Sequence, residues 1–444
     1  MNSTHKKIVD TFKIFIVKYC IYILIITYTL ASCSRNKIIV ETSYVDSLLK
    51  NYAAPAIATN QVDIEFWRKR IDIAKPGFTN ELKYSSALAA RFALTGNIHD
   101  LKSSDSILNL ISKIFNDKEA VPFTSLVARS ISQHKFNEAD TFLNKAKQIG
   151  IKQYDNAALS FDVNFELGRY NLAIANLNAI RSDKDYGYQF RRSKLEHYKG
   201  NLDSAISAML AAASLAGNDP VMVSAALSNA ADLYLHDGQL KSAYNLYKRS
   251  VGNNSSDLHS VMGIGWIALV HDKNDSLAKK IFLFASKKIQ APDPILKLSQ
   301  AAELNNDSLI MKKYAQQFVE IAGDSIYETM YNKYLIELYT GILNNPSKAE
   351  AIAKYEISNR ATPQTYAWYT WCLYFNNKKD KAYKVYEEHV SGKPLEGIEL
   401  YWMGKLMKGL GKGYNANEFF KAAEKNRYDL SPSMMRDLED NLKE

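Results

Sequence analysis

An alanine recurs at a nearly constant interval along most of this 444-residue chain. Each copy follows one local pattern: a turn with Gly or Asn, an apolar residue two positions later, and the alanine three further on. Successive copies are 34, 32, 38, 35, 71, 33 and 34 residues apart, and a degraded copy around Met311 divides the widest gap. A repeat of this length is one unit that buries its apolar face against neighbouring units. The marker residues are Ala139, Ala173, Ala205, Ala243, Ala278, Ala349, Ala382 and Ala416.

Fragments such as "GRYNLAIANLNAI", "GNLDSAISAMLAA" and "GQLKSAYNLYKRS" resemble the tetratricopeptide repeat (TPR). The resemblance implies two antiparallel helices per unit, with the small alanine where the helix axes come closest. It also places Gly168, Gly200 and Gly238 at the turn between the helices, where glycine adopts a positive φ most easily. A generic helical bundle would not keep such a phase. We therefore expect an all-α, right-handed superhelical solenoid of antiparallel helix pairs, with about nine to ten repeats over residues 59–430.

The two ends of the chain lack the repeat pattern. Over 431–444 we expect a capping helix, because Ser431 can cap it, Pro432 suits its first turn and its acidic residues give a polar outer face. Residues 33–58 have no repeat register. We expect this segment to be a tether.

The N-terminal segment has the layout of an export signal. An apolar run from Tyr19 to Leu30 follows a basic start, and the only acidic residue before position 33 is Asp10. The run is too short for a membrane-spanning helix, which needs about 20 apolar residues. The basic start consists of Lys6, Lys7, Lys13 and Lys18.

The run ends in Leu30-Ala31-Ser32-Cys33, which resembles the lipobox of bacterial lipoproteins. The resemblance implies that residues 1–32 are a removed signal peptide and that Cys33 becomes an acylated N-terminus, carrying diacylglycerol and an N-linked fatty acid such as palmitate. An ordinary secretory signal with a chance cysteine is the alternative. Ser34 replaces the Asp that retains many lipoproteins in the inner membrane, which favours the outer membrane. Residues 35–37 lack the acidic cluster used for surface export, so we expect a periplasm-facing protein.

Charge and cysteine content narrow the function classes. The signal contributes four lysines against one aspartate, so the formal net charge falls from +9 to +6 in the mature chain. This excess is scattered, and nucleic-acid binding is not expected for an exported protein. Cys20 leaves with the signal and Cys33 is acylated, so Cys372 has no partner for a disulfide. Its aromatic surroundings predict a buried, unreactive thiol.

The sequence contains no complete catalytic or cofactor-binding motif. "GLGKGYN", residues 409–415, lacks the Ser or Thr and the preceding strand of a phosphate-binding loop. His197, His236 and His271 are 39 and 35 residues apart, which places them on neighbouring repeats and too far apart to share one metal. We expect them to be polar groove residues. The predicted protein is not an enzyme and needs neither metal nor cofactor.

The TPR resemblance implies that a ligand binds along the concave face, which the first helices of the pairs line. Aromatic side chains interleaved with lysines suit a protein or peptide partner in the cell envelope, or a glycan stacked on aromatic rings. Core packing between repeats is the alternative for most of the Trp and Tyr residues. The predicted groove positions are Phe190, Lys194, Asp232, His236, Ile267, His271, Trp371, Tyr374, Tyr401, Lys405 and Lys408.

Two functions fit this architecture. The first is a membrane-anchored scaffold that binds another envelope protein without catalysis. The second is a glycan-binding accessory lipoprotein similar to the SusD-like class, which partners an outer-membrane transporter. The near-periodic array argues against the second, because SusD-like chains interrupt their repeats with large irregular insertions.

Six Asp-Ser-apolar triplets form a further pattern. They look like the O-glycosylation signal of some Gram-negative bacteria, while helix capping by Asp or Ser is the alternative. The serines are Ser47, Ser106, Ser204, Ser276, Ser308 and Ser325.

Overall fold

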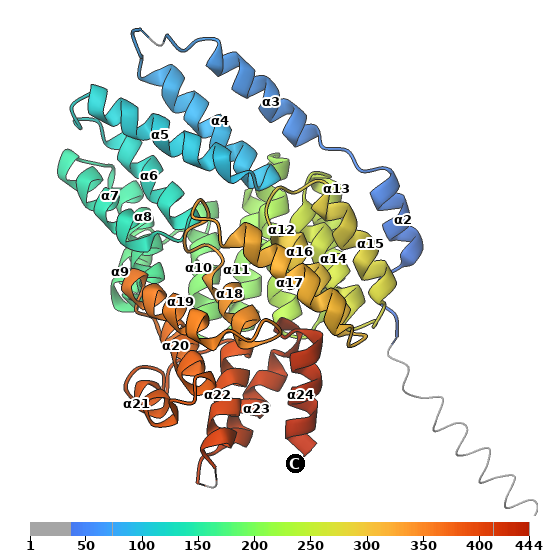
Figure 1. Cartoon of the computed structure of the whole chain (residues 1–444). Coiled ribbons are helices and arrows are strands. Elements are labelled where there is room, and N and C mark those ends of the chain that lie inside the picture. The colour runs from blue at the N-terminus through green and yellow to red at the C-terminus, as the bar shows by residue number, and fades with distance from the viewer. Residues whose placement is uncertain (1–36, 73, 412, 444) are drawn as a thin grey trace, which may run out of the picture. The chain divides into compact units, whose positions relative to one another are not determined.

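The computed structural model describes residues 37–72, 74–411 and 413–443, and in these ranges every regular element is a helix. Ten consecutive pairs of neighbouring helices make up most of this part (Figure 1). The prediction of a TPR-like solenoid with about nine to ten repeats is confirmed. The pairs are α4 (Thr79–Thr95) with α5 (Ile98–Ile114), α6 (Ala120–Ser132) with α7 (Phe136–Ile149), α8 (Gln153–Glu166) with α9 (Tyr170–Ala179), α10 (Tyr186–Tyr198) with α11 (Leu202–Leu215), α12 (Pro220–His236) with α13 (Leu240–Asn253), α14 (Leu258–Val270) with α15 (Asp275–Ser286), α16 (Asp293–Glu303) with α17 (Ser308–Ala322), α18 (Asn332–Thr340) with α19 (Pro346–Asn359), α20 (Pro363–Phe375) with α21 (Lys379–His389), and α22 (Gly397–Leu410) with α23 (Ala416–Lys425).

Four elements flank these pairs. The C-terminal helix α24 closes the array where a capping helix was predicted, after the short η1. At the other end, α2 and α3 precede the first pair. Their bounds are α2 (Thr42–Lys50), α3 (Pro55–Arg68), η1 (Arg427–Asp429) and α24 (Pro432–Lys443).

The marker alanines occupy one structural position. Seven of the eight are the fourth residue of the second helix and are fully buried, as close helix contact requires. The exception is Ala416, which is the first residue of α23 and only half-buried. Phe419 takes the fourth position there, and the facing helix supplies the small residue instead: a Cβ on Gly404 would lie 2.5 Å from the Phe420 ring. In the last repeat the small residue at the close contact therefore belongs to the first helix, α22, and the large residue belongs to the second, α23.

The turn inside each pair also has a fixed geometry. In nine pairs, the residue two positions before the second helix has a positive φ between 45° and 78°. Glycine fills this position in four pairs, while Asn, His or Lys fills it in the others, at a cost in backbone strain. The residues are Gly96, His134, Gly168, Gly200, Gly238, Lys273, Asn306, Asn344 and Asn377.

Gly200→Ala should lower the free energy of unfolding by about 1 kcal/mol, because φ is +78° and a Cβ there meets no neighbour within 4 Å. The loss would therefore come from the backbone alone. Gly252→Ala is the matched control: its φ is not positive, it lies in α13, and it too has nothing within 4 Å. Alanine at this helical position should be neutral or stabilising. Urea unfolding of the two variants measures the difference, and equal effects would contradict this explanation.

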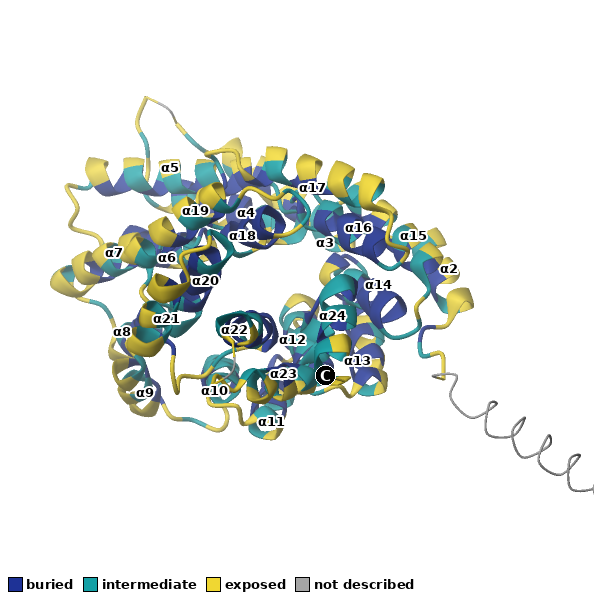
Figure 2. Cartoon of the chain, turned by 60° about the horizontal axis from the view of Figure 1, so that its bottom comes forward, coloured by how far each residue is buried: buried dark blue, intermediate teal, exposed yellow. Residues whose placement is uncertain are grey.

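Repeats far apart in sequence lie side by side, so the array contacts itself from one superhelical turn to the next. Asn359, the last residue of α19, donates from Nδ2 to the carbonyl oxygen of His134 at 2.6 Å and accepts at Oδ1 from the Phe136 amide at 3.1 Å. Glu328 forms ion pairs with Lys102 and Lys135. Figure 2 shows α19 beside α6, in agreement with the hydrogen bonds of Asn359. We call these contacts, together with the ion pair of Arg360 and Glu166, the turn-to-turn clasp.

The C-terminal elements close a second contact on the inner side. Trp266 in α14 donates its indole N–H to the carbonyl oxygen of Tyr428 at 2.8 Å. Glu303 at the end of α16 accepts from the amide and the hydroxyl of Ser433 at 2.9 and 2.6 Å. The segment of η1 and α24 therefore lies against α12, α14 and α16.

The segment before the first pair is packed against the array where the sequence predicted a tether over 33–58. The amides of Ile39 and Val40 donate to the Asp272 carboxylate at 3.0 and 2.8 Å, and Val40 and Val45 are each 1% exposed. Tyr44 of α2 contacts the Tyr244 ring edge-on. A tether can extend at most up to residue 38, because the buried side chains of Val40 and Val45 and the carboxylate of Asp272 hold the chain from Ile39 onwards.

Two further sequence expectations concern the membrane and the lone cysteine. No helix within the described ranges is both long and apolar enough to cross a membrane. The signal peptide and Cys33 lie outside the described residues. Cys372 is fully buried, and burial raises the pKa of its thiol. The prediction of a buried core cysteine is confirmed.

Candidate binding cavity

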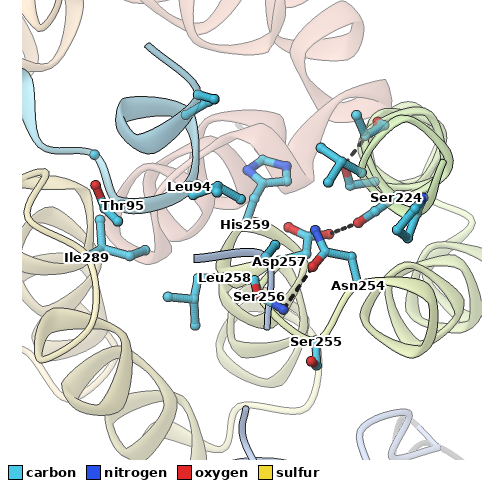
Figure 3. Close-up of a pocket in the computed structure, with 18 of the residues that line it drawn as sticks. Leu94, Thr95, Ser224, Asn254, Ser255, Ser256, Asp257, Leu258, His259 and Ile289 are labelled. Atoms are coloured by element: carbon cyan, nitrogen blue, oxygen red, sulfur yellow. Dashed lines mark hydrogen bonds between the residues drawn. The ribbon is translucent and has the colours of Figure 1, made fainter. Parts of the chain in front are cut away.

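A cavity of about 1050 Å³ lies between the N-terminal helices and the middle repeats. One face of α3 and the end of α4 form one wall, and the start of α12 with the α13–α14 connection forms another. Tyr331 and Asp293, before α18 and at the start of α16, complete the lining. Its volume is at the upper end of the range for ligand sites. Figure 3 shows Leu94 and Ile289 near His259 and Asp257 in this space.

Asp257 organises the polar wall of the cavity. Its Oδ1 caps α14 by accepting from the Ser260 amide at 3.1 Å. Its Oδ2 accepts from three serine hydroxyls, those of Ser250, Ser260 and Ser224, at 2.6, 2.6 and 3.0 Å. All of these donors are neutral, and together they hold the carboxylate in a fixed position.

The cation on this wall is His259. Its Nε2 lies 2.9 Å from the Asp232 carboxylate, which also accepts from the Tyr247 hydroxyl at 2.5 Å. Asp232 raises the pKa of His259 to about 9, so the imidazole is charged at neutral pH. The His259 side chain is 57% exposed, and it lines the cavity. A ligand can therefore contact this ion pair directly.

The cavity also has apolar walls and, among the described residues, two buried polar groups without a hydrogen-bond partner, one an amide oxygen and one a hydroxyl that can donate or accept. Leu94, Val221, Met262 and Ile289 supply apolar surface. Asn60 donates from Nδ2 to the carbonyl oxygen of Ala87 at 2.9 Å, which leaves its Oδ1 without a partner. The Ser256 hydroxyl has none either.

A second, smaller pocket of about 250 Å³ lies at the clasp. Its lysines and arginine meet carboxylates of the same lining: Glu166 pairs with Lys194 and, at 3.3 Å, with Arg360, while Lys333 pairs with Glu399 at 3.0 Å and Glu396 at 3.7 Å. These charged side chains are paired with one another and leave no charge for a ligand. We therefore assign this pocket to holding the superhelical turns together rather than to ligand binding.

The structure separates the predicted groove positions into several groups. Asp232 lines the large cavity and Lys194 the small pocket. Ile267, Trp371 and Tyr401 are buried in the packing between repeats, and for them the core interpretation holds.

The C-terminal part of the predicted groove is covered by the capping helix. Tyr401 and Lys405 contact the Asp437 carboxylate of α24 at 2.7 and 2.9 Å, and Lys408 donates to Asn441 at 2.8 Å. Phe190 and Tyr374 are half-buried against neighbouring rings, Tyr186 and Trp371 respectively. These positions fail as an open groove because the chain supplies its own partner there.

The three histidines, predicted to be polar groove residues on neighbouring repeats, do not share one environment. His197 and His236 are in contact, with ring centroids 5.1 Å apart, whereas His271 bonds the neighbouring Asp272 at 2.8 Å. His236 Nδ1 also lies 2.5 Å from Asp429 of η1. Within the described ranges, no three His, Cys, Asp or Glu side chains are grouped so as to hold a metal ion.

The pair of His236 and Asp429 predicts a pH dependence. Burial alone would lower the pKa of His236, but Asp429 outweighs this effect and the pKa rises to about 9. A raised pKa stabilises the fold fully below pH 6.5, and this contribution is lost as the pH rises through 9. The unfolding free energy should therefore fall by about 3 kcal/mol between pH 6.5 and 10 relative to His236→Gln. Urea titrations of both proteins across this range measure the difference, and parallel curves would refute it.

Five of the six predicted glycosylation serines are exposed, and Ser204 is half-buried. Ser47 and Ser106 lie inside helices, whereas Ser204, Ser276 and Ser308 lie in first turns. Asp307 caps α17 by accepting from the Ile310 amide at 3.0 Å, so capping explains at least that triplet. Glycosylation stays a prediction.

The cavity itself was not predicted. Of its polar lining, the sequence reasoning found Asp232 and missed His259, Asp257 and Asn60. Asp257 carries a readable signal, because an aspartate directly before an apolar helix is a typical N-cap. Nothing local indicates that α3 faces a helix 160 residues away.

No protein-family model matches this sequence, and no curated protein matches it. Several solved structures resemble it at low identity. PilF of Pseudomonas aeruginosa has a TM-score of 0.36 and 15% identity, covering 50% of this chain and 98% of that chain. A tetratricopeptide repeat protein from Parabacteroides merdae has a TM-score of 0.34 and 16% identity, covering 58% and 97%.

A signal-transduction ATPase from Pyrococcus horikoshii with a tetratricopeptide repeat sensor has a TM-score of 0.41 and 15% identity, covering 74% of this chain and 55% of that chain. The TPR-like fold of the present chain rests on its own helix pairs, positive-φ turns and buried alanines.

Proposed function

We propose that this protein is a lipid-anchored, non-catalytic scaffold of the cell envelope that holds a segment of a partner protein in the 1050 Å³ cavity. The observation that carries the proposal is the cavity itself. Its lining combines a charged wall, polar groups without a hydrogen-bond partner and apolar surface. A mixed lining of this kind suits a peptide segment better than a uniformly apolar lining does. Solenoids of helix pairs also present extended concave binding surfaces.

The form of the ligand follows from how the superhelix closes. α24 and η1 already contact α16 and α12, and the clasp joins α19 to the α6–α7 turn. A long helix lying along the whole concave face would compete with these contacts. A short segment or a chain end that enters between α3 and α12 would not. We therefore propose local capture of a segment, tested by crosslinking from the cavity lining as designed at the end of the Discussion.

The proposed location is the periplasmic face of the outer membrane, with the lipid on Cys33. The support is the lipobox-like Leu30-Ala31-Ser32-Cys33 together with Ser34. Only five residues separate Cys33 from Ile39, where docking on Asp272 begins. A fully extended chain spans about 3.5 Å per residue, so the array would stay within roughly 20 Å of the lipid attachment point.

Cys33→Ala should move the protein from the membrane fraction to the soluble fraction or leave it with an uncleaved signal. The reason is that each buried methylene of the acyl chains contributes about 0.8 kcal/mol to membrane attachment. Fractionation and intact-mass measurement report the result. Cys372→Ser is the control and should stay in the membrane. A membrane-bound, processed Cys33→Ala protein would overturn the lipid anchor.

A further inference from the structure

The charge of the cavity is opposite to that of the chain. Four carboxylates line it, and neither lysine nor arginine does, while the chain as a whole has a formal net charge of +9. His259 is the one basic side chain in the lining. A concave site lined by one sign of charge concentrates ligands of the opposite sign. The carboxylates belong to Asp63, Asp232, Asp257 and Asp293.

Most of this negative charge is held in place without being neutralised. Serine hydroxyls and a backbone amide satisfy Asp257, and the Tyr331 hydroxyl donates to Asp293 at 2.7 Å. Asp63 is exposed and forms no ion pair with any described residue. Among the four, only Asp232 forms a direct ion pair with a described residue, His259 at 2.9 Å, while Asp293 also interacts at longer range with His259 and with Lys297 of α16. Hydrogen bonds from neutral donors fix a carboxylate while leaving its charge for a ligand.

The unmet hydrogen-bonding groups point to the same chemistry. Asn60 and Ser256 line the cavity and are 7% and 3% exposed, and neither Asn60 Oδ1 nor the Ser256 hydroxyl has a partner. The bond from Asn60 Nδ2 to Ala87 fixes which end of the amide is the free one, and it is the acceptor. A buried acceptor without a partner is unfavourable, and an N–H donor on a ligand would remove that cost.

We propose that the cavity selects a cationic group, either a lysine or arginine side chain or a free amino terminus, flanked by apolar residues of the partner segment. The cation lies among Asp63, Asp257 and Asp293, and its apolar neighbours pack on Leu94, Val221 and Ile289. This inference rests on the proposed function and names the chemistry of its ligand. A neutral glycan fits less well, because Phe92 and Tyr331 are the only Phe, Tyr or Trp residues in the lining.

Calorimetric titration of the purified full chain in detergent tests the selectivity with three probes. These are acetyl-Leu-Lys-Leu-amide, the same peptide with Glu in place of Lys, and maltohexaose. The lysine peptide should bind at least about tenfold more tightly than the glutamate peptide, and the difference should shrink with added salt.

Two variants with opposite expected signs separate charge from structural damage. Asp63→Asn with Asp293→Asn removes two charges while the Tyr331 hydroxyl keeps an acceptor, and binding of the lysine peptide should weaken about tenfold or more. His259→Gln removes the one cation, and binding should strengthen about threefold or more. Asp155→Asn, at an exposed position in the first turn of α8, is the matched control and should change nothing.

Equal binding of the two peptides, binding of maltohexaose alone, no binding of any probe, or weakening in both charge variants would each overturn the inference. The proposed function fails separately. If a partner crosslinks to the cavity through a segment without a cation, capture stands and the charge selection is wrong. If the lysine peptide binds but no protein crosslinks from the cavity, the charge selection stands and the scaffold function is wrong.

Discussion

Replacing Arg360 by alanine is expected to destabilise the turn-to-turn clasp by about 3–5 kcal/mol. The guanidinium pairs with Glu356 at 3.0 Å and with Glu166 at 3.3 Å, and it lies 4.7 Å from the centre of the Phe136 ring. The Glu356 side chain is 1% exposed, so the variant leaves a buried carboxylate whose remaining partner is the Asn332 amide at 2.7 Å. An uncompensated buried charge is among the few causes of losses this large.

Hydrogen exchange measures this effect where it occurs. In Arg360→Ala, the backbone amide of Phe136, which donates to Asn359 Oδ1, should exchange faster, because it lies at the contact between superhelical turns. Adding Glu356→Gln should restore part of the protection by removing the buried charge. The protection in Arg360→Lys should lie between that of the wild type and that of Arg360→Ala, since a lysine keeps the charge but lacks the planar guanidinium that reaches both carboxylates. A loss below about 1 kcal/mol would show that the clasp does not hold the turns together.

Filling the cavity is expected to abolish capture of the partner. Ala93→Trp with Ala225→Trp places two indoles on opposite walls, one from α4 and one from α12. Both positions are at least partly exposed, so the rings can occupy the cavity without overpacking the core. We expect at least a tenfold loss of partner recovered after crosslinking, because a segment cannot enter an occupied site.

The control for this variant carries the same chemical change elsewhere. Ala58 and Ala351 are exposed and do not line the cavity. Ala58→Trp with Ala351→Trp should leave recovery of the partner unchanged. Equal losses in both double variants would mean that added tryptophans, rather than the cavity, cause the effect.

Local patterns predicted the repeating parts of this fold. The alanine interval, with Gly168, Gly200 and Gly238 at the turns, reports constraints that act within one helix pair and therefore leave a trace in nearby sequence. The same reasoning failed where a different residue type occupies the turn or the close helix contact. Lys273 and Asn344 adopt the positive φ that glycine marks elsewhere, and the last repeat exchanges its large and small residues between Gly404 and Phe420.

The site was harder to predict because it depends on how the superhelix closes. Asn60, Asp232 and His259 come from α3, α12 and α14 and meet only through the path of the whole array. The resemblance to TPR proteins implied an open groove, so it could not show that α24 covers Tyr401 and Lys405. The prediction of a tether over residues 33–58 missed the docking of Ile39 and Val40 on Asp272, because this contact follows no repeat.

The most direct test of capture in the cavity is photo-crosslinking in intact cells. A benzoylphenylalanine replaces Met262, which lines the cavity, and in a second strain it replaces Tyr355, which is 64% exposed and lies outside the lining. We predict one crosslinked envelope protein from position 262, lost in the Ala93→Trp/Ala225→Trp background and retained in the Ala58→Trp/Ala351→Trp background. Mass spectrometry should map the crosslink to a short segment of that protein. Crosslinking of the same protein only from position 355, or from position 262 regardless of the filled cavity, would contradict the account.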